Sequence, residues 1–122
     1  MTLICRGLRG ATTVKENTRE AILDATHELL NHLLDSNNLN KNDIAATFFT
    51  TTSDVNAEFP AVAAREMGWT HVPLLNSHEM NVPGMLPMCI RVLVLVNTEK
   101  QPEEMNHSYL RDASHLRPDI TR

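Results

Sequence analysis

The chain is poor in the residues that build disulfide frameworks and membrane spans. Its 122 residues include two cysteines, Cys5 and Cys89, and both lie in apolar stretches typical of strands. We expect them to be reduced core residues of a cytoplasmic protein. No apolar run approaches the roughly 20 residues that span a bilayer, so we expect no membrane partner. The segment before Arg6 is too short for the apolar region of a signal peptide, and we expect none.

Positive charge and reactive motifs are also scarce. The formal net charge is −4 and no run of basic residues occurs, which argues against a nucleic-acid partner. No HExxH or CxxC spacing is present, and no serine or cysteine stands in a nucleophile motif. We therefore expect no metal site and no nucleophilic catalysis. The basic side chains are mostly arginines, with Lys15, Lys41 and Lys100 as the lysines, which favours directional contacts with anions.

The apolar pattern predicts a single domain over residues 1–122. Helical spacing predicts two helices, at 17–36 and 61–67, the first begun by Asn17 with Glu20 three residues later, as in a capping box. Alternating and β-branched runs predict strands at 3–13, 45–52, 69–75, 89–96 and 107–116. This order fits an α/β (α+β) sandwich in which helices pack on one face of a mixed sheet.

The most apolar of these strands carries one charge. Residues 89–96 read CIRVLVLV, which predicts a strand buried on both faces. Arg91 lies near its start, and an unpaired guanidinium in the interior is costly, so it must meet an anion or reach water. Arg91 is therefore either a structural ion pair or a solvent-reaching strand end, or a rigid cation aimed into a pocket.

Two more charged residues border predicted strands. Glu79 follows the apolar strand at 69–75, and one loop joins it to the Arg91 strand, so that a carboxylate and a guanidinium can line the same pocket. Arg6 and Arg9 are an odd number of positions apart, and on an extended strand they face opposite sides. One of the two arginines can therefore point into the pocket.

The opening segment, Arg6–Thr13 (RGLRGATT), resembles the start of the monofunctional, trimeric AroH-type chorismate mutases. The resemblance is collinear over nearly the whole chain. It implies a fold like that of the Bacillus chorismate mutase, a homotrimer whose sheets form a pseudo-barrel with sites at subunit interfaces. The matching segments are Phe59-Pro60-Ala61, Arg65-Glu66, Trp69, Val72-Pro73, Glu79-Met80, Cys89-Ile90-Arg91-Val92, Tyr109-Leu110 and Leu116-Arg117-Pro118-Asp119.

The resemblance also implies roles for individual residues. Arg91 corresponds to the cation beside the breaking ether oxygen, Glu79 to the carboxylate that holds the substrate hydroxyl, and Arg9 to an arginine that binds a substrate carboxylate. Phe59, Ala61 and Arg65 match positions that a neighbouring subunit contributes. Further matching substrate-binding positions are Tyr109, Leu74, Leu75, Asn76, Leu116 and Arg117.

Some of these assignments have alternatives or departures. From the residues alone, Arg65 is a surface charge paired with Glu58 or Glu66. Val62 stands where some relatives have a lysine beside the substrate, and Asn76 replaces a small thiol-bearing residue. Both departures bear on affinity and leave the central charges in place.

The family converts chorismate to prephenate by an intramolecular Claisen rearrangement, on the route to phenylalanine and tyrosine. The reaction has no covalent intermediate, proton transfer or redox step, so the resemblance implies no cofactor. An enzyme can help by holding the compact conformer and by placing a fixed charge beside the ether oxygen. Two alternatives stay open: a trimeric imine/enamine deaminase, which also uses arginine on carboxylates, and a non-catalytic carboxylate-binding module.

Overall fold

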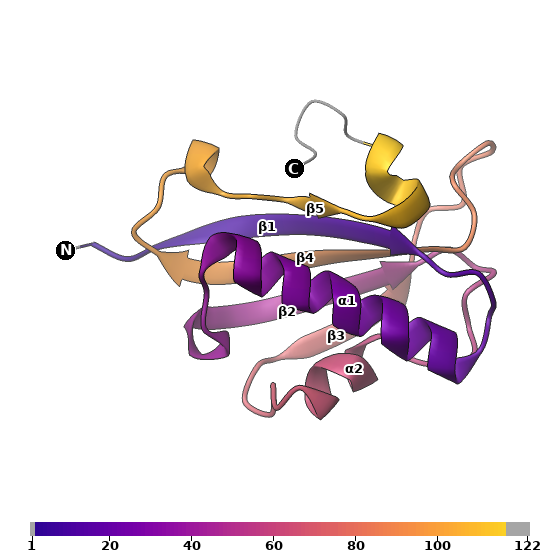
Figure 1. Cartoon of the computed structure of the whole chain (residues 1–122), viewed down its shortest axis with the longest axis horizontal. Coiled ribbons are helices and arrows are strands. Elements are labelled where there is room, and N and C mark those ends of the chain that lie inside the picture. Colours follow the sequence, from indigo (N-terminus) through magenta and orange to yellow (C-terminus); the bar gives the residue numbers. More distant parts are fainter. Residues whose placement is uncertain (1, 117–122) are drawn as a thin grey trace.

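Strand β4 (Cys89–Thr98) lies at the centre of a five-stranded mixed sheet with the order β3-β2-β4-β1-β5 (Figure 1). The computed structural model describes residues 2–116. Strand β4 pairs antiparallel with both of its neighbours, whereas the two edge strands pair parallel with theirs. The other strands are β1 (Ile4–Thr13), β2 (Ile44–Thr51), β3 (Leu74–His78) and β5 (Ser108–Tyr109).

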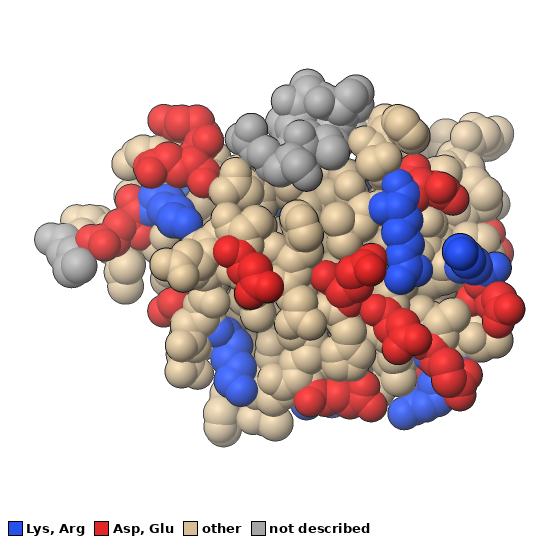
Figure 2. All heavy atoms as spheres, viewed as in Figure 1, with Lys and Arg blue, Asp and Glu red and all other residues tan. Residues whose placement is uncertain are grey.

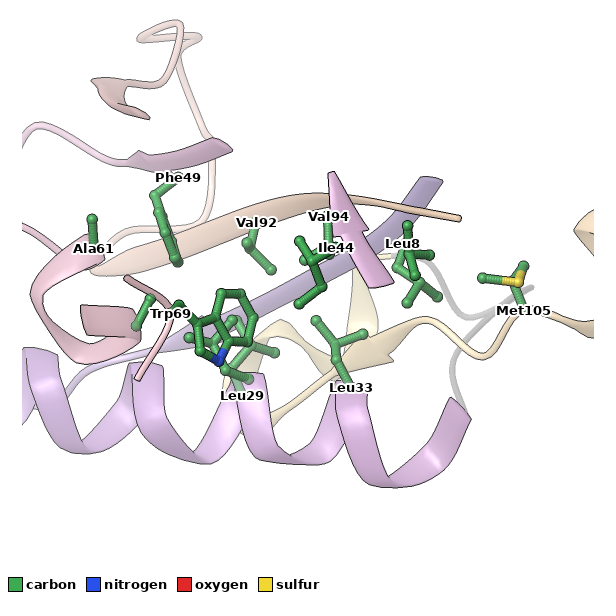
Figure 3. Close-up of a cluster of buried hydrophobic side chains, with 13 residues drawn as sticks. Leu8, Leu29, Leu33, Ile44, Phe49, Ala61, Trp69, Val92, Val94 and Met105 are labelled. Carbon is green, nitrogen blue, oxygen red and sulfur yellow. The ribbon is translucent and has the colours of Figure 1, made fainter. Parts of the chain in front are cut away.

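Both helices, α1 (Arg19–Asn37) and α2 (Ala61–Glu66), pack on the same face of this sheet. In Figure 3 the side chains of Leu29 and Leu33 on α1 point toward Val92 and Val94 on β4. Trp69, which is 2% exposed, fills the space beside them. The predicted class, helices on one face of a mixed sheet, is confirmed. We refer below to the other side of the sheet as the uncovered face.

One prediction about β4 is wrong. The residues of β4 alternate between the two faces of the sheet: Val92 and Val94 are buried against the helices, whereas Arg91 and Leu93 lie on the uncovered face and are partly exposed. The prediction of a strand buried on both faces is therefore wrong for the chain as described. An apolar run predicts that both faces of a strand are shielded from water, but in the described chain only the face toward the helices is buried. Cys5, expected in the core, lies on this face and is exposed.

The start of α1 differs by one residue from the prediction. The cap is Thr18, whose hydroxyl accepts a hydrogen bond from the Ala21 amide at 3.2 Å. Asn17 instead uses its side-chain oxygen to accept from the amides of Asn56 and Ala57, both at 2.9 Å. Asn17 therefore ties the chain that precedes α1 to the loop after β2.

Two predicted strands are shorter or shifted. The third begins at Leu74 rather than at Trp69, because the Trp69 amide donates to Ala64 at the end of α2 and its ring enters the core. The fifth contains two residues, because Arg111 adopts a positive φ of 54°. A left-handed backbone cannot continue a strand, and residues Arg111–His115 form a 3-10 helix instead.

Two further structural tests concern membranes and metals. No helix among residues 2–116 is long and apolar enough to cross a membrane. The same residues contain no group of three or more histidine, cysteine or acidic side chains that could hold a metal ion.

Candidate active site

Neighbouring strands bring the predicted charges together on the uncovered face. Arg91 on β4 lies directly opposite Ala11 on β1, and Arg9 lies opposite Leu93. The two arginines are therefore diagonal neighbours on one face, at a Cα separation of about 7–8 Å. Glu79 directly follows β3, and its amide donates to the Thr51 carbonyl at 2.8 Å. This bond extends the sheet by one residue and brings the carboxylate to the same end.

A cavity of about 300 Å³ opens between these side chains. Four sequence-predicted residues line it: Arg9, Glu79, Arg91 and Tyr109. Two guanidiniums face one carboxylate, so the charged lining is net positive although the whole chain carries −4. On the opposite, helix-covered face, carboxylates are widely spread among few basic side chains (Figure 2). The cavity is therefore suited to an anion.

Arg91 and Glu79 contact each other inside this cavity. Arg91 Nε lies 3.5 Å from Glu79 Oε2, and the two side chains are 39% and 31% exposed. Both interpretations drawn from the sequence thus apply, since Arg91 has an ion-pair partner and still lines a pocket. The contact involves one nitrogen at long range, which leaves the guanidinium able to meet a second anion.

The Glu79 carboxylate has two further partners. Its Oε1 accepts from the Met80 amide at 3.1 Å, and its Oε2 accepts from the Thr50 hydroxyl at 3.3 Å. Thr50 also lines the cavity, as do Gly10, Phe48, Val92 and Leu93. Sequence reasoning missed Thr50, although it lies two positions after Phe48 and thus on the same face of β2.

Tyr109 belongs to a small apolar cluster at one end of the uncovered face. It is 5% exposed and packs with Ala11, Cys89 and Ala113, and Leu116 packs against them. Burial within this cluster raises the pKa of the Cys89 thiol. Leu116 contacts the cluster that contains Tyr109 but does not itself line the cavity. Arg117 lies outside the described residues.

Arg111 anchors the segment that carries this cluster. Its Nη1 donates to the Thr13 carbonyl and its Nε to Glu28 Oε1, both at 3.1 Å. The Leu110 amide donates to the Ala11 carbonyl at 2.9 Å. The chain on either side of Tyr109 is thus fixed to β1 and α1.

The remaining predicted residues lie apart from this cavity in the single chain. Phe59 and Asn76 line a second cavity of about 310 Å³. Ala61 is fully buried, and its amide donates to Asn76 Oδ1 at 3.1 Å. Leu74 and Asn76 point to the helix side of β3, whereas Leu75 is 58% exposed on the uncovered face. The predicted residues therefore line separate cavities instead of one, and Phe59 and Asn76 do not share a cavity with Arg9, Glu79, Arg91 and Tyr109.

Arg65 is exposed and lines a third hollow with Leu74. The ion pair that the sequence suggested for Arg65, with Glu58 or Glu66, is not formed within residues 2–116. Glu58 pairs with Arg19 and Glu66 with His27. The pKa of Glu58 lies below its ordinary value, chiefly because the Phe59 amide donates to it, with the charges of Arg19 and Arg65 adding to the effect. Arg65 thus remains exposed without an ion-pair partner in the described part of the chain.

Comparison with known proteins bears on what this arrangement does. Residues 5–120 match the family described as chorismate mutase type I. Two curated relatives are similar to the chain: chorismate mutase AroH of Thermus thermophilus is 50% identical over 116 residues, covering 94% of this chain and 95% of the relative. The protein of the same name from Bacillus subtilis is 40% identical over 120 residues, covering 98% and 94%. A solved chorismate mutase from Clostridium thermocellum matches with a TM-score of 0.87 at 45% identity, covering 88% of this chain and 96% of that one.

Proposed function

Since the chain belongs to the type I chorismate mutase family and is a chorismate mutase, an isomerase of aromatic amino-acid biosynthesis, we propose that the cavity on its uncovered face binds chorismate. The observation that carries this proposal is the convergence of Arg9, Glu79, Arg91 and Tyr109 on one cavity. The family match decides against the deaminase and the non-catalytic binding module.

The proposed roles follow from the charges of substrate and site. Chorismate carries two carboxylates, and the rearrangement builds negative charge on its ether oxygen as the carbon–oxygen bond breaks. In our proposal Arg9 holds a carboxylate and Arg91 faces the ether oxygen. Glu79 accepts a hydrogen bond from the substrate hydroxyl, and Tyr109 supplies a further polar contact. These groups bind and orient a single molecule, and none of them has to gain or lose a proton.

The rigidity of the scaffold supports the role given to Arg91. It lies on the central strand, paired on both sides with Ala11 and Thr50. A charge that is already in place when the transition state forms needs no reorganisation during the reaction. An arginine also stays charged and keeps its planar fork in a fixed direction. The position of Arg91 therefore suits electrostatic stabilisation of the ether oxygen.

We further propose that the active enzyme is a homotrimer that works in the cytoplasm. The uncovered face exposes Phe48, Leu75 and Leu93 by 39%, 58% and 39%, which is a surface that a second copy of the chain can cover. Phe59, 62% exposed, and Arg65 are free to extend into a neighbour's cavity. Both cysteines are unpaired, as suits a reducing compartment.

A bicyclic analogue of the transition state tests the proposed site. We expect purified protein to bind the analogue more tightly than chorismate, because a catalyst is complementary to the transition state. Calorimetry on the wild type and on Arg91→Ala measures both affinities. Equal affinity for analogue and substrate, or an analogue affinity that survives Arg91→Ala, contradicts the assignment of this cavity as the catalytic site.

A further inference from the structure

We propose that Thr50 is a positioning residue for this reaction, because its hydroxyl fixes the orientation of the Glu79 carboxylate. The inference rests on the proposed role of Glu79 and extends it to a residue to which no role has been assigned above. In this proposal the Thr50 hydroxyl keeps the Glu79 carboxylate available to the substrate, instead of leaving it to be neutralised by Arg91.

Thr50 occupies a central position in the site. On β2 it lies directly opposite Arg91 of β4 on one side and opposite Ser77 of β3 on the other. Its side chain points to the uncovered face and lines the cavity. The other threonines of β2 behave differently: Thr51 donates to the Val55 carbonyl at 3.0 Å, and Thr47 is 1% exposed on the helix side. Only Thr50, among these three, has a hydroxyl that reaches the proposed catalytic charges.

Glu79 needs such a partner because little else orients it. It follows the end of β3, at the edge of the sheet, and its side chain is 31% exposed. The Met80 amide holds Oε1, and the Thr50 hydroxyl holds Oε2 at 3.3 Å. The same Oε2 faces Arg91 Nε at 3.5 Å. Thr50 and Arg91 therefore share Oε2 of Glu79, while the Met80 amide holds Oε1, so both carboxylate oxygens are restrained.

Removing the hydroxyl has a specific consequence. Oε2 then keeps Arg91 as its sole partner within residues 2–116, and two opposite charges without a competing donor move closer together. A tighter ion pair turns the carboxylate away from the substrate hydroxyl and partly neutralises the cation meant for the ether oxygen. In this proposal the Thr50 hydroxyl contacts the Glu79 carboxylate and not the reacting atoms of the substrate, so Thr50 influences the reaction rate through Glu79.

The first test compares three substitutions on β2. We expect Thr50→Val, which keeps the shape and removes the hydroxyl, to lower kcat/KM about ten- to a hundredfold, as loss of a hydrogen bond to a charged group does. Thr50→Ser keeps the hydroxyl and should stay within about threefold of the wild type. Thr47→Val is the matched control: the same change on the same strand removes a buried hydroxyl that has no hydrogen-bond partner in the described chain, and activity should not change. Thr50→Ala is a second removal of the hydroxyl, should the valine variant fail to fold.

The second test is a double-mutant cycle with Glu79→Ala. If Thr50 acts through Glu79, adding Thr50→Val to Glu79→Ala should change kcat/KM by less than about twofold. Wild-type kcat/KM in both Thr50→Val and Thr50→Ala overturns the inference, and so does a Thr50→Val loss that persists in the Glu79→Ala background. Full activity in Glu79→Ala alone contradicts instead the proposed role of Glu79, so the two failures are distinguishable.

Discussion

Replacing Arg91 tests the central electrostatic claim. We expect Arg91→Ala to fold and to lose about 10²–10³ in kcat, the usual effect of removing one fixed donor from a developing oxyanion. We expect Arg91→Lys to lose most of kcat as well, because an ammonium group lacks the planar, directional fork of a guanidinium. Spectrophotometric consumption of chorismate measures both losses.

The size of the loss follows from the partly exposed setting of the side chain. Arg91 is 39% exposed, so an effective dielectric constant near that of a protein surface applies. At about 4 Å and a dielectric constant of about 20, two unit charges interact by about 4 kcal/mol. A partial charge on the ether oxygen realises part of this, about 3 kcal/mol, which is about a hundredfold in rate.

Stability should change much less than rate. The contact of Arg91 with Glu79 is a single 3.5 Å approach between partly exposed groups, and such pairs contribute about 0–1 kcal/mol. We therefore expect Tm to move by less than about 5 °C. Arg6→Ala is the control, because Arg6 lies on the other face of β1 and donates from Nε to the Lys100 carbonyl at 3.1 Å. Near-normal turnover in Arg91→Ala, with Arg6→Ala also active, refutes the mechanism.

Two other predictions concern the assembly and the core. If Arg65 and Arg91 of one site come from different subunits, Arg65→Ala and Arg91→Ala should each be nearly inactive, yet refolding an equal mixture should restore about a quarter of the sites; no recovery on mixing contradicts a shared site. Gly10→Ala should lower the free energy of unfolding by about 1–3 kcal/mol in urea titrations, because a Cβ there meets Val92 Cγ1 at 3.0 Å and Leu29 Cδ1 at 3.1 Å. Unchanged stability would show that the core gives way more easily than these distances suggest.

The sequence predicted those features that depend on local pattern. Helix α1 and strands β1, β2 and β4 follow from periodicity, and the class of fold follows from their order. Arg91 was identifiable because it is a charge in an apolar strand. The prediction that Arg6 and Arg9 point to opposite faces of the sheet is also confirmed, because their partners Val96 and Leu93 lie on opposite faces of β4. The roles given to most site residues came from the family resemblance and stay predictions.

What the sequence did not reveal depends on distant parts of the chain. Trp69 reads as the start of a strand, yet it belongs to the core after α2. Nothing local shows that Arg111 adopts a positive φ and ends β5 after two residues. Thr50 is one of several threonines, and its importance appears only when β3 brings Glu79 alongside β2. Pairing between strands decides these points, and single-strand patterns do not contain it.

The central place of β4 in the sheet has a consequence for biosynthesis. Strands β1 and β2 leave the ribosome before β4, but each pairs with β4, and Ile4 at the start of β1 lies opposite Thr98 at the end of β4. Strands β1 and β2 therefore cannot join one sheet until β4 has been translated, and its insertion pairs segments that are far apart in the sequence. Because the same strand carries Arg91, the charge proposed to face the ether oxygen reaches its position only when the middle of the sheet is filled.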